Sequence, residues 1–230
     1  MTSFPFDAVL FDCDGVLVDS EPITNRVLAQ MLTELGWPLT AEESMRIFTG
    51  KAVKDEAALI AAKTGFTLTP DWMASFWARR NAALDADLLA IPGAAQAVRA
   101  LHVQLEGRIA CASGADRHKV ELQLQKAGIL DCFEGRIFSG HETPRSKPFP
   151  DVYLAAAAAL GVPAARCAVI EDTVTGVTAG VAAGATVFGY SPGTLGHSSP
   201  QAMREAGAVQ LFDDMAQLPA VLAAWRFAPA

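Results

Sequence analysis

Two aspartates that directly follow a short apolar run constrain this chain most. The run Ala8–Phe11 predicts a buried strand, and Asp12 and Asp14 come where that strand ends. Ligands of open parallel sheets bind outside the carboxyl ends of the strands. Two carboxylates are costly there unless a cation holds them, which favours a Mg²⁺ site with a carboxylate nucleophile for phosphoryl transfer. The alternative is an Asp- and Gly-containing turn that only closes the strand.

Composition restricts the possible partners. The chain has 230 residues, a net charge of −7 and 51% hydrophobic residues, so it can bury a large core and lacks the general basic character of nucleic-acid-binding proteins. No apolar run approaches the ~20 residues of a membrane span, and we expect no secretory signal because the chain does not start with a basic patch and an apolar stretch. The four cysteines show no close-pair spacing, which predicts a reducing, cytoplasmic setting without disulfides or zinc.

Short apolar runs alternate with helical patterns through most of the chain. This alternation is typical of an α/β fold, a parallel sheet with helices on its faces. The predicted strands are residues 8–11, 108–112, 136–138, 167–170, 185–190 and 209–212, and the predicted helices between them are residues 94–105, 118–127, 152–160 and 174–183.

Residues 21–90 interrupt this alternation. They contain no convincing strand, and their apolar residues recur at helical spacing. The sequence therefore predicts a core domain of residues 1–20 and 91–230 with an inserted four-helix cap domain, residues 21–90. The predicted cap helices are residues 23–35, 41–48, 53–63 and 72–84.

Further polar residues follow other predicted strands. Ser113 and Gly114 come after the second strand, and Glu171 and Asp172 come after the fourth. The carboxyl ends of parallel strands share one edge, so these residues can converge with the first aspartates. Each has a simpler interpretation: Ser113 as a turn residue, Asp172 as a helix N-cap and Glu171 as a partner of the helix dipole.

Two more segments carry polar residues that a site could use. Lys147 lies in a proline-rich stretch between the second and fourth strands, although it could equally be a solvated lysine beside a turn. The Gly- and Ser-rich stretch 193–199 contains His197 and is predicted to be a surface loop, with a loop at the rim of the site as the alternative.

The order of these residues resembles the haloacid dehalogenase superfamily. Four motifs carry the resemblance, around Asp12-Cys13-Asp14, Ser113, Lys147 and Glu171-Asp172. They are most similar to the branch of sugar-phosphate phosphatases and β-phosphoglucomutase-like enzymes with a helical cap, including 6-phosphogluconate phosphatase-like proteins. The resemblance covers nearly the whole chain and implies a Rossmann-like core with the cap inserted after the first motif.

The resemblance implies a role for each acid. Asp12 would attack phosphorus and form an aspartyl-phosphate, and Asp14 would protonate the leaving oxygen and later activate water. Mg²⁺ would be held by the Asp12 carboxylate, the Asp14 backbone carbonyl and Asp172, with Glu171 nearby.

It also implies how the substrate is bound. Ser113 and the Gly114 N–H would bind phosphoryl oxygens, and Lys147 would neutralise charge, because a carboxylate cannot approach a phosphate unless cations screen the repulsion. In relatives, a cap loop contacts the leaving group. Lys51 and Lys54 lie in the matching loop here and could contact the substrate, or could be solvated lysines at a helix start.

Within this family the residues favour hydrolysis of a small phosphorylated metabolite, a sugar or sugar acid. Asp14 favours phosphoryl transfer over carbon–halogen cleavage, because the dehalogenases lack an acid at that position. Mutases typically carry a His twelve positions after the nucleophile, where this chain has Thr24. A β-phosphoglucomutase-type mutase, a phosphonatase and a non-catalytic binding protein are the alternatives. Relatives with this cap are often monomers, so we expect a monomer.

Overall fold

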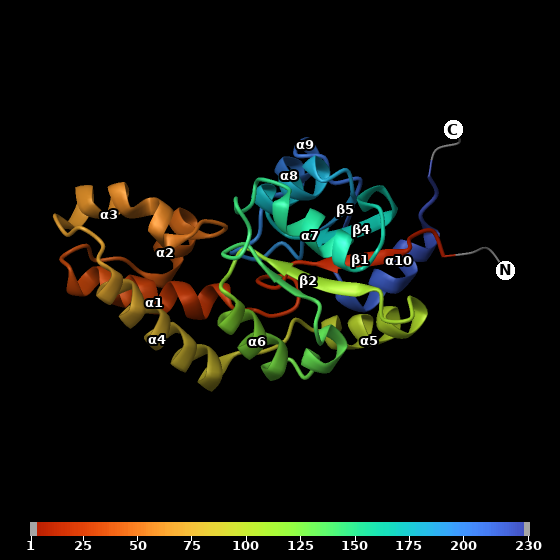
Figure 1. Cartoon of the computed structure of the whole chain (residues 1–230). Helices are drawn as coiled ribbons and strands as arrows, with labels where there is room; N and C mark the ends of the chain where they lie inside the picture. The colour runs from red at the N-terminus through yellow and green to blue at the C-terminus, as the bar shows by residue number, and fades with distance from the viewer. Residues whose placement is uncertain (1–3, 228–230) are drawn as a thin grey trace.

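The fold is built on a six-stranded parallel sheet. A computed structural model describes residues 4–227. The sheet has the order β3-β2-β1-β4-β5-β6, and every neighbouring pair is parallel (Figure 1). The strands are β1 (Ala8–Phe11), β2 (Ile109–Ser113), β3 (Ile137–Ser139), β4 (Cys167–Glu171), β5 (Thr186–Tyr190) and β6 (Gln210–Phe212).

Strand β1 lies at the point where the strand order reverses. Its register pairs Phe11 with Cys111 of β2 on one side and with Ile170 of β4 on the other. The chain moves outward from β1 to β2 and β3, and then returns to the other side for β4, β5 and β6. Such a reversal leaves a crevice at the carboxyl ends of the strands, where ligands of these folds bind.

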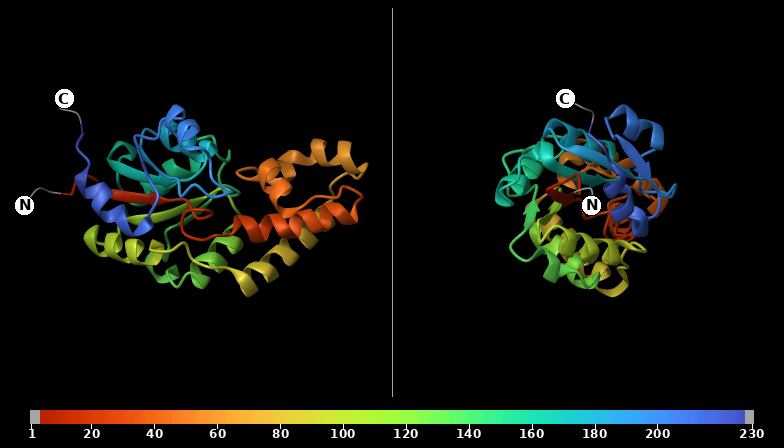
Figure 2. Two further views of the ribbon diagram at one scale, coloured as in Figure 1. Left: turned by 180° about the vertical axis from the view of Figure 1, so that it is seen from behind. Right: turned by 90° about the vertical axis from the view of Figure 1, so that its right-hand side faces the viewer.

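Helices cover both faces of the sheet (Figure 2). The alternation of side chains along β1 separates two cores, because Val9 and Phe11 face one layer and Ala8 and Leu10 face the other. The first layer contains α5 (Ala94–Gln104), α6 (Arg117–Lys126) and α10 (Leu218–Ala224), and the second contains α7 (Asp151–Ala159), α8 (Val174–Ala182) and α9 (Pro200–Glu205). Short 3-10 helices η2 (Leu130–Phe133), η3 (Ala164–Arg166) and η4 (Met215–Gln217) join these elements.

The segment of residues 21–90, which we call the cap, forms a separate group of helices beside the sheet (Figure 1). It contains α1 (Glu21–Glu34), α2 (Ala41–Phe48), the 3-10 helix η1 (Val53–Glu56), α3 (Ala57–Thr64) and α4 (Pro70–Asp87). Local sequence starts these helices: a Thr40–Glu43 capping box precedes α2, and the Thr69 side chain caps α4. The cap has its own apolar core.

Two segments join the cap to the core, and they are hydrogen-bonded to each other. Val18 and Ala90 form an antiparallel bridge. The Asp19 N–H donates to the Leu89 carbonyl at 3.0 Å, and the Ile91 N–H donates to the Leu17 carbonyl at 3.0 Å. Entry and exit of the cap therefore form one short two-stranded connection.

Most differences from the sequence predictions lie at element ends. The predicted helix 53–63 begins as the 3-10 helix η1. Ser113 and Glu171 are the last residues of β2 and β4 rather than the first residues after them. Helices α9 and α10 were not predicted, because they are short and lack a long amphipathic pattern. All six predicted strands are confirmed, as is the parallel α/β fold.

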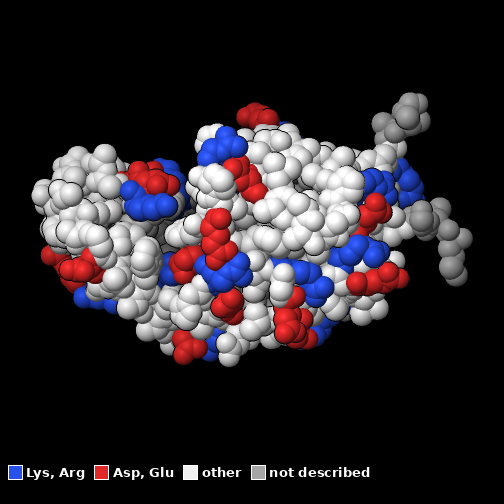
Figure 3. Space-filling view, viewed as in Figure 1, with Lys and Arg blue, Asp and Glu red and all other residues white. Residues whose placement is uncertain are grey.

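Two further features concern the cysteines and the surface. Each of the four cysteines is buried and free. Among residues 4–227, no helix combines the length and apolarity that crossing a membrane requires. On the face shown in Figure 3, acidic and basic side chains are interspersed, and no continuous basic patch covers that face.

Candidate active site

Asp12 lies at the carboxyl end of β1, where the sheet order reverses. Its backbone N–H donates to the Ile170 carbonyl of β4 at 3.0 Å, which extends the ladder by one residue and fixes where the side chain begins. The Asp12 side chain is 10% exposed and lines the main cleft. The first predicted site residue is therefore buried but open to a ligand.

Lys147 joins two of the predicted acids. Its Nζ donates to Asp12 Oδ1 at 2.8 Å and to Glu171 Oε1 at 2.7 Å, and its side chain is 8% exposed. Burial alone would lower the pKa of Lys147, but Asp12 and Glu171 raise it well above its usual range. The lysine is thus a fixed cation against Asp12, and the solvated-lysine interpretation is wrong.

Glu171 is held by donors on both carboxylate oxygens. Oε1 accepts from Lys147 and from the Tyr153 hydroxyl, each at 2.7 Å. Oε2 accepts from the backbone N–H of Asp172 at 3.0 Å and from the Thr173 hydroxyl at 3.1 Å. Glu171 is fully buried. Since its oxygens are occupied, it serves best to fix Lys147 in place.

Asp172 has an unused ligand atom. Its Oδ1 is buried and has no hydrogen-bond partner among the described residues. The next residue, Thr173, is the N-cap of α8, so Asp172 is not the cap that its sequence position also allowed. A Cβ on Gly15 would lie 2.2 Å from Asp172 Oδ2, and Gly15 has a φ of +74°. Only glycine therefore leaves room for this carboxylate beside the first motif.

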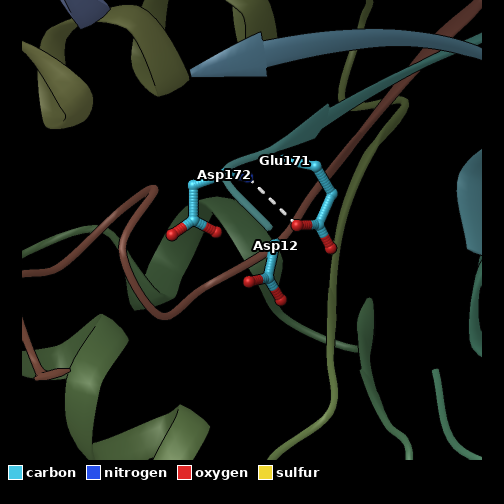
Figure 4. A group of neighbouring side chains, drawn as sticks. All are labelled: Asp12, Glu171 and Asp172. Atoms are coloured by element: carbon cyan, nitrogen blue, oxygen red, sulfur yellow. Dashed lines mark hydrogen bonds between the residues drawn. The ribbon is translucent and has the colours of Figure 1, made fainter. Parts of the chain in front are cut away.

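The carboxylates of Asp12, Glu171 and Asp172 gather around one point (Figure 4). One oxygen from each lies within 4.8 Å of the others. An orphaned buried oxygen within a cluster of hard oxygen donors fits a divalent cation such as Mg²⁺. The donor set therefore suits a metal of this class.

The same crowding shifts the pKa values of these acids. Burial raises the pKa of Asp12, Lys147 opposes the shift, and Glu171 and Asp14 add to it, with a result of about 7. Burial, followed by the charges of Glu171 and Asp12, raises the pKa of Asp172 well above its usual range. Negative charge is in excess at this point, and a cation would relieve it.

The Asp14 carboxylate binds a different set of partners. Asp14 Oδ1 accepts from Lys119 Nζ and from Gln123 Nε2, each at 2.7 Å, and from the Ser20 hydroxyl. Burial would raise the pKa of Asp14, but the charge of Lys119 and these hydrogen bonds lower it to about 2. In this arrangement Asp14 is an ionised, firmly held group.

Ser113 and Gly114 lie at the end of β2 and line the same cleft. The Ser113 Oγ accepts from the Ala115 N–H at 3.1 Å, so the residue does form the turn that its sequence also allowed. Its hydroxyl hydrogen has no acceptor among the described residues and can donate to an oxygen in the cleft. The two functions are compatible.

The cleft, of about 360 Å³, lies between the strand ends and the cap. Lys51 and Lys54 both line it. Lys51 pairs with Glu56 at 3.3 Å, whereas Lys54 has no ion pair within the described residues. The two predicted cap cations are thus present at the cleft but differ in how they are held.

Sequence reasoning missed several residues that contact the predicted acids, among them Tyr153, Lys119 and Gln123. Lys119 and Gln123 are one helical turn apart on α6, and their i, i+4 spacing beside the buried Val120 and Leu124 was the available signal. His197 Nε2 lies 3.0 Å from the Gly15 carbonyl, and the side chain is 7% exposed. Much of this loop is exposed, as predicted, but the His197 side chain is buried against the first motif.

Three comparisons place this geometry among known proteins. A family model described as haloacid dehalogenase-like hydrolase matches residues 6–184. The 6-phosphogluconate phosphatase of Escherichia coli (strain K12) is 31% identical over 214 residues, 93% of each chain. Hexitol phosphatase B of the same organism is 30% identical over 178 residues, 76% of this chain and 79% of that protein. A crystal structure of a HAD family hydrolase from Deinococcus radiodurans R1 with bound phosphate and sodium is 39% identical, covers 96% of both chains and has a TM-score of 0.76.

Proposed function

Since this chain belongs to the haloacid dehalogenase-like hydrolases and is a phosphoric monoester hydrolase, we propose that it is a Mg²⁺-dependent phosphatase that uses an aspartyl-phosphate intermediate. We propose a small phosphorylated sugar or sugar acid as its substrate. The observation that carries the proposal is the Asp12 carboxylate, bonded to Lys147 at 2.8 Å and next to the free oxygen of Asp172.

Asp12 is the nucleophile of the proposed reaction. One of its oxygens bonds to phosphorus while the bond from phosphorus to the ester oxygen breaks, and water then cleaves the aspartyl-phosphate to release inorganic phosphate. Lys147 lowers the repulsion between the carboxylate and the phosphoryl group. The Ser113 hydroxyl and the Gly114 N–H bind phosphoryl oxygens. Lys147 acts in both steps, because each has a doubly charged group next to Asp12.

Asp14 moves the proton. It donates to the departing ester oxygen and later accepts a proton from the attacking water. An acid bound to Lys119 at 2.7 Å is ionised, so Asp14 has to leave this partner and take up a proton from solvent before it can donate. Closure of the cap over a bound substrate would allow Asp14 to change partners in this way.

We propose that Mg²⁺ is held by the carboxylates of Asp12 and Asp172 and by the Asp14 backbone carbonyl. When bound, it would offset the charge of the carboxylates and of the phosphoryl oxygens. Glu171, whose oxygens already accept from protein donors, supports the site by holding Lys147. A divalent ion at this place also explains why so many acids share a buried volume.

Substrate choice belongs to the cap side of the cleft. Two similar proteins carry names that refer to a phosphorylated sugar acid and to hexitols, and Lys51 and Lys54 would contact such a polar chain. We keep a monomer in the cytoplasm as the expected state. Thr24 lines the cleft in place of the mutase histidine, which favours hydrolysis over a β-phosphoglucomutase-type transfer.

The test is release of inorganic phosphate from p-nitrophenyl phosphate and from a panel of sugar phosphates and sugar acid phosphates. We expect turnover with Mg²⁺ and none with excess EDTA. Turnover that is equal in EDTA would reject the metal, and no turnover of any ester would reject the activity. Incubation with β-glucose 1-phosphate should give free phosphate and no glucose 6-phosphate.

A further inference from the structure

One wall of the cleft, where the cap meets the loops after β2 and β3, carries three basic side chains. Lys54 comes from η1, Arg80 from α4 and His141 from the loop after β3. Partial burial and the charge of Lys54 lower the pKa of His141, Arg80 lowers it further, and Asp116 and Asp55 oppose the shift. None of the four sequence motifs contains these residues.

Arg80 is a buried cation with free donors. Its side chain is 7% exposed, and Nη2 donates to Asp116 Oδ2 at 2.8 Å. Nε and Nη2 also donate to Asn81 Oδ1, at 3.0 and 2.8 Å, and the guanidinium lies 5.8 Å from the Phe76 ring centre. The hydrogen bonds of Arg80 within residues 4–227 all come from Nε and Nη2, none from Nη1, and Arg80 lines the cleft. The side chain is therefore held rigidly, with two N–H groups left for a ligand.

Lys54 differs from its neighbour Lys51. Lys51 pairs with Glu56 at 3.3 Å, so its charge is already balanced. Lys54 is exposed at the cleft and forms no ion pair within the described residues, although Asp55 follows it in the sequence. Its ammonium group can therefore turn toward an anion in the cleft at little cost.

The acids on this wall limit the charge of the ligand. Asp116 is bound by Arg80 and also caps α6, where it accepts from the Lys119 N–H at 3.0 Å. Asp55 adds a second carboxylate at the cleft. The Nη1 group of Arg80 and one ammonium, set against these two acids, suit a singly charged carboxylate better than a phosphate dianion.

We propose that Arg80 and Lys54, assisted by the His141 ring, bind a carboxylate at the end of the substrate opposite its phosphoryl group. The enzyme then prefers a phosphorylated sugar acid to the sugar alcohol phosphate of the same length. This inference rests on the proposed phosphatase function and names its substrate class.

The experiment uses two substrates that differ only at one terminus. 6-Phosphogluconate carries a carboxylate where glucitol 6-phosphate carries a hydroxymethyl group. We would measure kcat/KM for both, with Mg²⁺, for the wild-type enzyme and for Arg80→Gln and Lys54→Gln. Arg79→Gln and Lys63→Gln are matched controls: Arg79 pairs with Glu34 on the outer side of α4, and Lys63 lies over Trp37.

We expect the wild-type enzyme to prefer the acid by roughly 10-fold or more. Arg80→Gln should lower kcat/KM for the acid by about 30-fold and Lys54→Gln by about 5-fold, with smaller losses for the alcohol, so that the acid-to-alcohol ratio falls in both variants. The controls should keep both values. Turnover of p-nitrophenyl phosphate, which lacks the distal carboxylate, reports on folding and on the chemical step.

Several results would overturn the inference. One is a wild-type preference for the alcohol, and another is an acid-to-alcohol ratio that neither variant changes while p-nitrophenyl phosphate is still hydrolysed. A larger loss on a sugar bisphosphate than on the acid would assign the subsite to a second phosphate instead. If Arg80→Gln does not fold, Lys54→Gln decides, because Lys54 is exposed. A wild-type protein that hydrolyses no ester would instead reject the phosphatase function itself.

Discussion

The two ends of the cleft are built in different ways. At the strand ends, Asp12, Lys147 and Glu171 are buried and joined by hydrogen bonds of 2.7–2.8 Å. On the cap wall, Lys54 is exposed and unpaired within the described residues, and only Arg80 is firmly held. The fold therefore holds the proposed reacting groups rigidly, whereas on the cap wall Lys54 keeps the freedom to adapt to a ligand.

Replacing Asp12 should have the largest effect. Asp12→Asn removes the nucleophile, so we expect kcat on p-nitrophenyl phosphate to fall by about 10⁴-fold or more. Steady-state phosphate release measures it, with Asp131→Asn, a surface acid paired with Arg99, as the control. An Asp12→Asn enzyme with more than a few per cent of wild-type kcat would contradict the assignment of Asp12 as the nucleophile.

Lys147 comes next. Lys147→Met removes the cation that faces Asp12, so we expect kcat to fall by about 10²- to 10³-fold. It also leaves Asp12 and Glu171 without their buried partner, which should lower the free energy of unfolding by about 3 kcal/mol in the absence of metal. Urea unfolding and phosphate release together check both parts. Normal kinetics in a folded variant would show that Lys147 is merely structural.

A change that touches no reacting atom tests the rigidity itself. A Cβ on Gly176, in the first turn of α8, would lie 1.7 Å from Glu171 Oε1. Gly176→Ala must therefore displace Glu171 and with it Lys147, and we expect a loss of about 10- to 100-fold in kcat. Thr178→Ala, on the same helix and facing solvent, is the control. Equal kcat in the two variants would mean that the strand end adapts as easily as the cap wall.

The smallest effect is expected at Glu21, where the cap meets the cleft. Burial raises the pKa of Glu21 from 4.5 to about 7, so the folded protein holds a proton that the unfolded chain has released. This contribution to stability is present below pH 4.5 and is lost as the pH rises toward 7. Asn25 donates to Glu21, and a glutamine oxygen can accept the same bond.

Glu21→Gln should therefore be more stable than the wild-type protein by about 1 kcal/mol near pH 8 and about equal near pH 4. Urea unfolding at both pH values measures this difference. The figure is modest because Glu21 is partly open to the cleft. A variant that is less stable at the higher pH would show that Glu21 is ionised there and stabilised by a contact that glutamine lacks.

The sequence was most informative where side chains lie next to a strand end. Apolar runs located all six strands, and a residue that directly follows a strand of a parallel sheet can lie only at one edge. This is why Asp12 and Asp172 could be placed in one cluster although they are far apart in the chain. The two side chains are close because both follow strands of the same parallel sheet, and short apolar runs were enough to locate those strands.

Contacts that depend on helix rotation or loop path could not be read in this way. Lys119 reaches Asp14 because of how α6 turns its face toward β1, and the sequence of α6 alone does not fix that angle. Arg80 is buried because α4 packs against both α1 of the cap and α6 of the core, whereas its sequence context is that of an ordinary surface cation. His197 meets Gly15 through the path of an irregular loop.

The paired connection between cap and core has a consequence for substrate size. Two independent linkers would let the cap slide and twist, but the ladder of Leu17–Asp19 against Leu89–Ile91 must bend as one ribbon. If the cap closes over a substrate, we expect it to rotate about this connection toward the strand ends. A molecule that spans the cleft would then limit the rotation, so we expect turnover to depend on the length of the substrate as well as on its charge.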